Sequence, residues 1–238
     1  MLALQVRGVL RWYMKDSITA IEAAEFQDTI LRSLEQHIAP YVVKLKGRDY
    51  ALFPQVFNPN YAKASILLLD NLGVREGDVV LDPFTGCGAD AIFAVLEGAS
   101  RAVAIDKFTM PYLCARYNAY MLGLEDRVDV RQGDLFDPLR KDEKFDLIIA
   151  NPPFKDIEPQ TTIESAVRDF RYNALKRFFS DVDNYLKSDG RIRMVFSNVG
   201  DRGYLNKLIK DNNFKSRIIA RDKYAAKVII DVHEIIRV

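Results

Sequence analysis

The residues NPPF, which follow the apolar run FDLIIA, are suited to hold a planar nitrogen. Pro152 and Pro153 fix the backbone and have no N–H to donate, so their carbonyls are left to act as acceptors. Asn151 adds a side-chain carbonyl, and Phe154 adds an aromatic face. An amino group on a flat conjugated system would find acceptors for its hydrogens and a ring to stack on. The alternative is a purely structural Asn-Pro-Pro turn.

The loop DPFTGCG, from Asp82 to Gly88, lies between a predicted strand and a predicted helix. Gly86 and Gly88 allow a tight turn and a close approach of the backbone to a ligand. Ala91 stands at the third position of the G-x-G-x-x-G dinucleotide fingerprint, which the looser G/A form allows. The alternative is a turn of small residues that packing requires.

Two acidic residues end the next two strands. Asp106 comes 24 residues after Asp82 and can accept both hydrogens of a ribose diol, although Asp also caps helices. Asp134, in the run GDLF, can accept a hydrogen bond from an adenine amino group, although Gly-Asp also begins ordinary turns. Phe108 and Leu135 could add apolar contacts to an adenine ring.

A regular alternation of strands and helices must position these residues. Apolar β-branched runs alternating with amphipathic helices predict a doubly wound, mostly parallel sheet with helices on both faces. Ligands bind at the carboxyl ends of such strands, where all four segments lie. We expect helices at 62–72, 89–96, 111–122, 163–186 and 204–210, and strands at 79–82, 101–106, 128–133, 145–150, 191–198, 214–221 and 227–238.

The last two strands are separated by a short turn and must pair antiparallel, because a parallel pair needs a long crossover. Before the alternation, the sequence predicts a helix over Ser17–Ile38, two short strands around Gly47–Asp49 and a loop, FPQVFNPNY. We therefore divide the chain into an extension, residues 1–59, and an α/β domain, residues 60–238. The segment Tyr41–Asn60, which contains Phe57, is expected to cover the substrate.

In the order of its motifs, the chain resembles the class I S-adenosylmethionine-dependent methyltransferases from about Phe53 to the end. DPFTGCG is similar to their motif I, and NPPF resembles the catalytic motif of their amino-methylating branch. That branch includes RNA guanine-N2 and adenine-N6 methyltransferases and release-factor glutamine methyltransferases. The resemblance implies a seven-stranded Rossmann-like fold and S-adenosylmethionine as cofactor. It also implies catalysis by Asn151, Pro152 and Phe154, substrate contacts from Phe57 and Pro153, and cofactor contacts from Asp82, Thr85, Gly86, Gly88, Asp106, Lys107, Asp134 and Leu135.

Composition limits the partners. The net charge of +1 is low for a protein that holds nucleic acid across its whole surface. The two cysteines have neither metal-type nor disulfide spacing, so we expect no metal and a reduced, cytoplasmic setting. No run of about 20 apolar residues predicts a membrane span.

We expect His37 and His233 to be surface or packing residues. The cluster of basic residues after NPPF predicts a solvated helix face or a contact to phosphate or to an acidic substrate: Arg168, Arg171, Lys176 and Arg177.

The sequence thus predicts an N-methyltransferase acting on a planar amino or amide nitrogen. An RNA base is the first choice, followed by a protein glutamine amide and then by a small metabolite nitrogen. The competing classes are a cofactor-binding module without activity and a nicotinamide-dependent oxidoreductase. The intact NPPF and acidic residues argue against the first, and Asp134, NPPF and the antiparallel final strand argue against the second.

Overall fold

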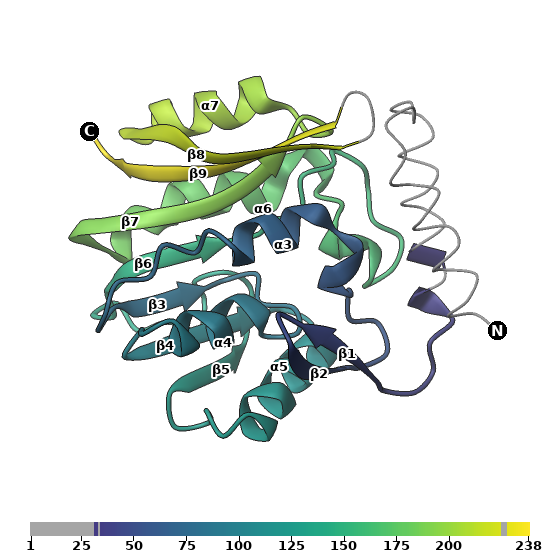
Figure 1. The fold of residues 1–238 in the computed structure, drawn as a ribbon. Coiled ribbons are helices and arrows are strands. Elements are labelled where there is room, and N and C mark those ends of the chain that lie inside the picture. The colour runs from purple at the N-terminus through teal and green to yellow at the C-terminus, as the bar shows by residue number, and fades with distance from the viewer. Residues whose placement is uncertain (1–30, 33, 225–227) are drawn as a thin grey trace.

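A computed structural model describes residues 31–32, 34–224 and 228–238 (Figure 1). Most of the helix predicted over Ser17–Ile38 lies outside these residues. The main sheet has seven strands in the order β5-β4-β3-β6-β7-β9-β8. Their bounds are β3 (Val79–Asp82), β4 (Arg101–Asp106), β5 (Val128–Gln132), β6 (Phe145–Ala150), β7 (Leu186–Ser197), β8 (Phe214–Tyr224) and β9 (Val228–Arg237).

All neighbouring strands from β5 to β7 pair parallel, whereas β9 pairs antiparallel with both β7 and β8. The predicted sheet and its antiparallel last strand are therefore confirmed. Five helices connect the strands: α3 (Lys63–Leu69), α4 (Ala89–Leu96), α5 (Thr109–Met121), α6 (Asn173–Asp181) and α7 (Arg202–Asp211). Within the described residues, no helix is both long and apolar enough to cross a membrane.

Side chains of the central strands alternate between two hydrophobic cores, one on each face of the sheet. In β4, Ala102 and Ala104 join the core beneath α3, α4 and α5, whereas Val103 and Ile105 join the core beneath α6 and α7. Successive residues of a strand point to opposite faces, so a strand buried on both faces reads as a continuous apolar run. This explains why the sequence predicted these strands well.

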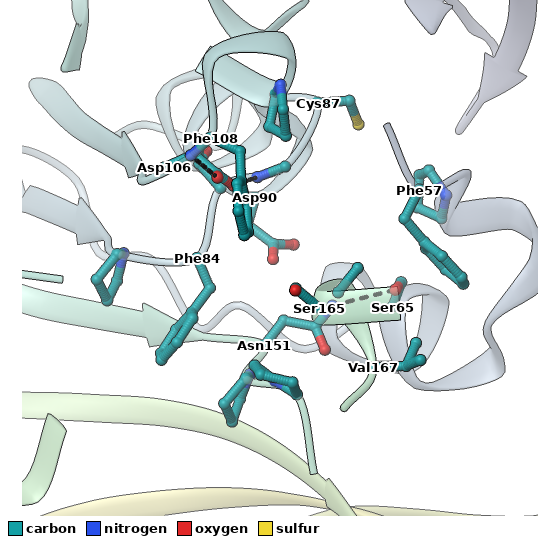
Figure 2. A pocket seen from close by; sticks show the side chains of 18 of the residues that line it. Phe57, Ser65, Phe84, Cys87, Asp90, Asp106, Phe108, Asn151, Ser165 and Val167 are labelled. Carbon is teal, nitrogen blue, oxygen red and sulfur yellow. Dashed lines mark hydrogen bonds between the residues drawn. The ribbon is translucent and has the colours of Figure 1, made fainter. Parts of the chain in front are cut away.

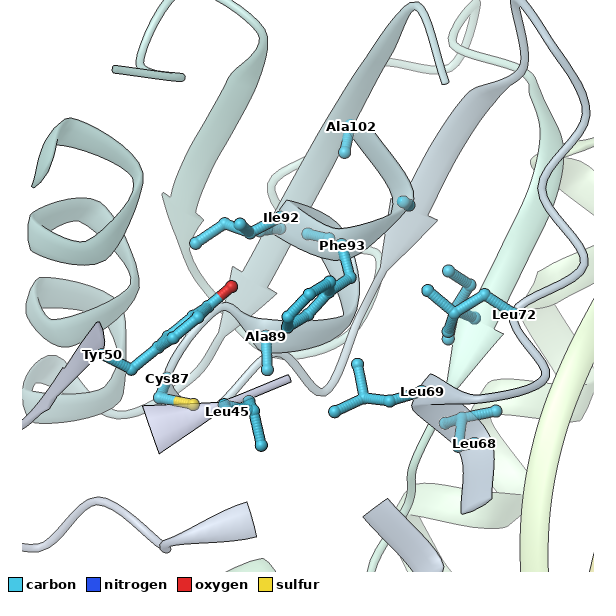
Figure 3. Close-up of a cluster of buried hydrophobic side chains, with 14 of the residues drawn as sticks. Leu45, Tyr50, Leu68, Leu69, Leu72, Cys87, Ala89, Ile92, Phe93 and Ala102 are labelled. Atoms are coloured by element: carbon cyan, nitrogen blue, oxygen red, sulfur yellow. The ribbon is translucent and has the colours of Figure 1, made fainter. Parts of the chain in front are cut away.

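The two short strands before the domain are confirmed as an antiparallel hairpin of β1 (Tyr41–Leu45) and β2 (Arg48–Leu52). The hairpin is part of the first core, where Tyr50 is fully buried. The Tyr50 ring stacks on the Phe93 ring, with the two ring centroids 5.8 Å apart (Figure 3). The buried Asn118 side chain of α5 accepts a hydrogen bond from Ala51 N at 2.8 Å and donates to Ala51 O at 2.9 Å. The hairpin is thus anchored to α5 by both polar and apolar contacts.

The long helix predicted over residues 163–186 is wrong. The segment contains two 3-10 turns, Glu164–Ala166 and Phe170–Tyr172, before α6 begins at Asn173. Arg171 and Tyr172 adopt left-handed backbone conformations, with φ of +54° and +52°, which an α-helix excludes. The Asp169 carboxylate then accepts hydrogen bonds from the first amides of α6, at Ala174 and Leu175. Strand β7 also begins earlier than predicted, at Leu186.

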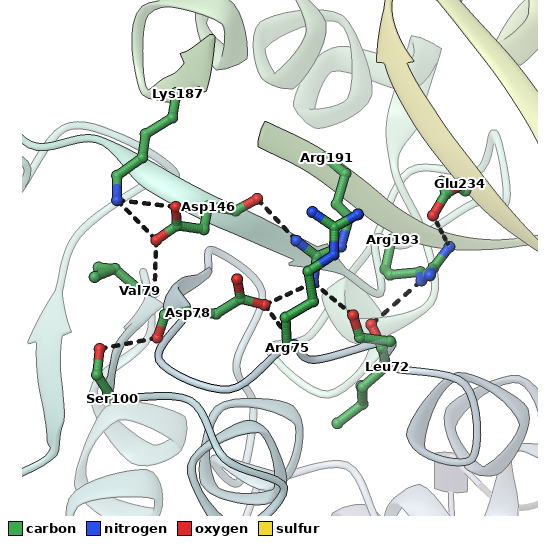
Figure 4. A network of polar contacts seen from close by, with 11 residues as sticks. Leu72, Arg75, Asp78, Val79, Ser100, Asp146, Lys187, Arg191, Arg193 and Glu234 are labelled. Atoms are coloured by element: carbon green, nitrogen blue, oxygen red, sulfur yellow. Dashed lines mark hydrogen bonds and ion pairs between the residues drawn. The ribbon is translucent and has the colours of Figure 1, made fainter. Parts of the chain in front are cut away.

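A buried ionic network fixes the end of the sheet away from the carboxyl ends of the parallel strands (Figure 4). Arg191 of β7 donates to the Asp78 carboxylate at 2.6 Å and to the Gly73 carbonyl at 2.5 Å. Asp78 also accepts from Arg75 N at 2.7 Å. Both charged side chains of this pair are nearly inaccessible, at 3% and 7% exposure. The connection between α3 and β3 is therefore tied to β7.

Removing one partner of this pair should strongly destabilise the fold. Asp78→Ala leaves the Arg191 guanidinium buried without its counter-ion, so we expect the free energy of unfolding to fall by about 3–5 kcal/mol. Asp49→Ala is the matched control, because Asp49 pairs with Lys44 with both side chains more than half exposed. It should cost less than about 1 kcal/mol. Urea unfolding of both variants measures the difference, and equal losses would contradict a dominant role for the buried pair.

Candidate active site

A cavity opens at the carboxyl ends of β3, β4 and β6, where parallel sheets bind their ligands (Figure 2). The structure brings eleven of the thirteen predicted site residues to its lining: Phe57, Thr85, Gly86, Asp106, Lys107, Asp134, Leu135, Asn151, Pro152, Pro153 and Phe154. The exceptions are Asp82 and Gly88. Phe57 lies in the loop before α3, so the segment that precedes motif I does reach this cavity.

Asp82 lies beneath the motif I loop rather than in the cavity. Its fully buried carboxylate accepts hydrogen bonds from Thr85 Oγ1 at 2.7 Å and from Phe84 N at 3.2 Å. Burial raises the pKa of this carboxyl, and the two hydrogen bonds oppose that rise. In this position the Asp82 carboxylate is hydrogen-bonded within the loop and does not line the cavity.

Gly88 has a packing role at the start of α4. Its φ is +87°, and a Cβ there would lie 3.1 Å from Ala115 Cα in α5. A side chain at this position would therefore force α4 and α5 apart. For Gly88 the structure supports the alternative of a small residue required for packing, and Gly86 alone of the two glycines faces the cavity.

Asp106 connects the end of β4 to the motif I loop. Its Oδ2 accepts from Gly86 N at 3.1 Å, and its Oδ1 accepts from Phe108 N at 3.0 Å. Burial raises the pKa of this carboxyl to about 6, and the two backbone donors limit the rise. Phe108, not Asp106, occupies the N-cap position of α5. Each carboxylate oxygen can accept a further hydrogen bond, which suits the two hydroxyls of a ribose.

The Asp134 carboxylate forms an ion pair with Arg177 of the basic cluster. Arg177 Nη1 lies 2.5 Å from Asp134 Oδ2, and Arg177 Nη2 lies 3.1 Å from Asp137. Oδ1 of Asp134 accepts no hydrogen bond from the described residues and remains available at the edge of the cavity. In the rest of the cluster, Arg168 pairs with Glu164 at 2.6 Å, and the Arg171 guanidinium lies 4.9 Å from the Phe170 ring.

Asn151 is oriented by a residue that the sequence analysis did not identify. Its Nδ2 donates a 3.0 Å hydrogen bond to Ser65 Oγ, on the buried face of α3 (Figure 2). The amide nitrogen is thereby directed to α3, and Oδ1 accepts no hydrogen bond from the described part of the chain. The sequence did carry a signal for this role. Ser65 lies among the apolar residues Ala64, Leu68 and Leu69 on the buried face of a helix, and a buried hydroxyl needs a hydrogen-bond partner.

Neither histidine lies in the cavity. His37 stacks on Tyr41 with ring centroids 4.5 Å apart, and His233 is buried in β9, where burial lowers its pKa. In the described residues, no group of three or more His, Cys, Asp and Glu side chains is placed to hold a metal ion.

Comparisons with known proteins support one family. The family model described as "Methyltransferase small domain" matches residues 54–225. Over 190 residues the chain is 30% identical to a Methanocaldococcus jannaschii protein provisionally named a protein N5-glutamine methyltransferase, covering 76% of this chain and 92% of that protein. It is 30% identical over 186 residues to the tRNA (guanine(10)-N2)-dimethyltransferase of Methanothermobacter thermautotrophicus, covering 78% of this chain and 49% of that enzyme.

Among solved structures, the T. thermophilus 16S rRNA N2 methyltransferase in complex with AdoMet and guanosine has the same fold. The TM-score is 0.61 at 19% identity, over 84% of this chain and 50% of that one. Asp106 and Asp134 both line the cavity described above. The chain belongs to the methyltransferase small domain family and is an S-adenosylmethionine-dependent N-methyltransferase.

Proposed function

We propose that this enzyme methylates a planar amide or amino nitrogen held by Asn151 Oδ1 and the Pro152 carbonyl. The observation that carries this proposal is the hydrogen bond from Asn151 Nδ2 to Ser65 Oγ. Because the donor end of the amide is occupied by Ser65, the acceptor end faces the cavity. An NH2 group with two hydrogens to donate is the chemical complement of two carbonyl acceptors.

The bound cofactor supplies an electrophilic methyl group on sulfur, and the protein supplies position and electrostatics. The lone pair of an amide or aromatic NH2 is delocalised, so the nitrogen is a weak nucleophile. Hydrogen bonds to Asn151 and Pro152 concentrate the lone pair on nitrogen and stabilise the positive charge that develops there. The attached methyl group makes the remaining proton acidic, so the step needs no strong base. The Phe154 ring lines the cavity, and its centroid lies 5.6 Å from the centroid of the Phe196 ring. This packing fixes an aromatic ring beside the substrate nitrogen.

For the cofactor, we propose that Asp106 binds the ribose hydroxyls and that Asp134 Oδ1 accepts from the adenine amino group. Leu135, Phe108 and Lys107 line the cavity beside these acids and complete the adenosine site. Thr85 and Gly86 form the wall on the loop side. Asp82 and Gly88, which the sequence assigned to direct cofactor contacts, act in this proposal through the shape of the loop and the packing of α4.

We further propose that the segment 53–61 covers the substrate. Phe57 lines the cavity from this segment, as do Gln55 and Pro59. The hairpin before it packs against the core through Leu45, Tyr50 and Leu52, so the cover joins the domain near Phe53. The boundary predicted at residue 59 falls inside this segment. The two cysteines are free and buried, which supports the proposed cytoplasmic location.

A glutamine amide of a protein is the substrate class that we place first. The sequence alone favours an RNA base, through the motif resemblance. Three arginines of the basic cluster, however, already contact Glu164, Asp134 and Phe170 within the chain. The match to the Methanocaldococcus jannaschii protein also spans nearly all of that relative. An RNA base amino group is the second candidate, favoured by the equal identity to the tRNA guanine-N2 enzyme.

Asn151→Ala should separate chemistry from binding. The substitution removes the side-chain acceptor, so we expect turnover to fall about 100-fold or more while cofactor affinity stays within about twofold. Labelled methyl transfer to fractionated protein, RNA and metabolites from the source cells measures turnover, and calorimetry measures affinity. Label in protein glutamine supports the first substrate class, and label in RNA supports the second. Retention of turnover within a few-fold would show that NPPF is a structural turn.

Binding of adenosine should depend on pH through Asp106. Its pKa of about 6 in the free protein means that the carboxylate, the form that accepts ribose hydroxyls, is present above pH 6 and is lost as the pH falls. Only about a tenth of the carboxyl is ionised one unit below its pKa, so affinity should be about tenfold lower at pH 5 than at pH 7. NMR titration with adenosine measures this. Asp106→Asn is the control and should bind weakly at both pH values. The same pH dependence in this variant would contradict the ribose assignment.

A further inference from the structure

Asp90 is a buried acid in the cavity that neither the motifs nor the proposed reaction uses. It lies in the first turn of α4, and 7% of the residue is exposed. Its carboxyl group is directed into the cavity, on the side of Cys87 and Phe108 in the close-up view (Figure 2). Asp90 follows the motif I loop, at a position where a helix covering the sheet would ordinarily present an apolar residue.

The Asp90 carboxyl differs from the other two acids of the cavity in having no partner. Asp106 accepts from two backbone amides, and Asp134 accepts from Arg177. Asp90 accepts no hydrogen bond from residues 31–32, 34–224 and 228–238. A buried carboxylate without a donor or counter-ion is costly, and such groups are found where a ligand supplies the missing partner.

The charges around Asp90 are unfavourable for a second anion. Burial raises the pKa of the Asp90 carboxyl well above its usual range, and the negative charge of Asp82 adds to that rise. Burial is the main cause of the raised pKa of the Tyr50 hydroxyl and of the Cys87 thiol, and the negative charge of Asp90 adds to both shifts. A cation with hydrogens to donate would supply the missing hydrogen bonds of the Asp90 carboxylate and offset its negative charge.

We propose that the Asp90 carboxylate binds the α-ammonium group of the methionine part of S-adenosylmethionine. The proposal rests on the placement of ribose at Asp106 and adenine at Asp134 given above. Asp134 follows β5, Asp106 ends β4 and Asp90 opens the helix after β3, and these strands are neighbours in that order. All three acids line the same cavity, so they can contact successive parts of one extended ligand.

The sulfonium is a less suitable partner for Asp90 than the ammonium. It carries no N–H, so it would leave the carboxylate oxygens without a hydrogen bond. A carboxylate beside it would also stabilise the positive charge that methyl transfer removes, and binding the reactant more tightly than the transition state slows a reaction. The ammonium keeps its charge throughout. Asp90 bound there would add affinity without opposing the transfer.

The test compares S-adenosylhomocysteine with its deaminated analogue, in which hydrogen replaces the α-amino group. The wild-type protein should bind S-adenosylhomocysteine about 10- to 100-fold more tightly, the range of a hydrogen bond between charged groups. In Asp90→Asn this preference should shrink to within about threefold, because an amide lacks the charge. Calorimetry with each ligand gives the four affinities of the cycle, and no methyl acceptor is needed.

Two controls identify other roles. The melting temperature of Asp90→Asn without ligand should equal or exceed that of the wild type, because a buried acid without a hydrogen-bond partner is replaced by a neutral group of the same shape. Asp106→Asn should weaken both ligands equally, since it acts on the adenosine that they share. If Asp106→Asn changes neither affinity, the ribose placement fails, whereas the Asp90 comparison still reports on the ammonium.

Three results would overturn the proposal. The first is an unchanged preference for S-adenosylhomocysteine in Asp90→Asn. The second is an equal loss of affinity for S-adenosylhomocysteine and for its deaminated analogue in Asp90→Asn, which would show that Asp90 only maintains the shape of the motif I loop. The third is a loss of S-adenosylmethionine affinity more than tenfold larger than the loss for S-adenosylhomocysteine, which would place Asp90 at the sulfonium.

Proton release provides an independent readout. An arriving ammonium favours the charged form of Asp90, so S-adenosylhomocysteine should release a proton that the deaminated analogue does not. Asp106 also titrates near this cavity, but both ligands carry the same adenosine, so its contribution cancels in the comparison. Asp82 does not line the cavity, and its carboxylate is already hydrogen-bonded to Thr85 and Phe84. Calorimetry in two buffers of different ionisation enthalpy measures the difference, which should vanish in Asp90→Asn. A difference that persists in this variant would contradict the assignment.

Discussion

The hydrogen bond between Asn151 and Ser65 joins the two halves of the active site. It connects the end of β6, which carries NPPF, to α3, which begins directly after the segment that covers the cavity. Because an amide has one donor end and one acceptor end, fixing the donor on Ser65 also fixes the acceptor. The proposed selection of an NH2 group therefore depends on a helix that lies far from NPPF in sequence.

The rest of the fold holds α3 in place for this contact. Leu68 and Leu69 of α3 are buried in the core that also contains the hairpin and α4. The connection from α3 into β3 is fixed to β7 through Asp78 and Arg191. The site is thus built where apolar packing and a buried ion pair restrict the same helix. A small shift of α3 would move Ser65, and the orientation of Asn151 would follow.

The sequence was most informative where chemistry and strand periodicity coincide. Asp106 and Asn151 end or follow apolar runs that are buried on both faces, so their meeting at one edge followed from the topology. The helix predicted over residues 163–186 failed because Arg171 and Tyr172 are left-handed without being glycine, and amphipathic spacing does not reveal that. Ser65 and Asp90 were overlooked because each has a role only beside residues that the fold brings to it. The motif placed Asp82 in its loop, but a motif does not state which way a side chain points, and this carboxylate is hydrogen-bonded within the loop instead of lining the cavity.

A double-mutant cycle on Ser65 and Asn151 tests the central claim most directly. Ser65→Ala alone should lower kcat about tenfold, the scale of about 1.4 kcal/mol for a hydrogen bond that orients a catalytic group. It should leave cofactor affinity unchanged. In the Asn151→Ala background, where no amide remains to be oriented, the same change should alter kcat less than about twofold. An equal, tenfold loss in both backgrounds would show that Ser65 acts independently of Asn151 and would contradict the account.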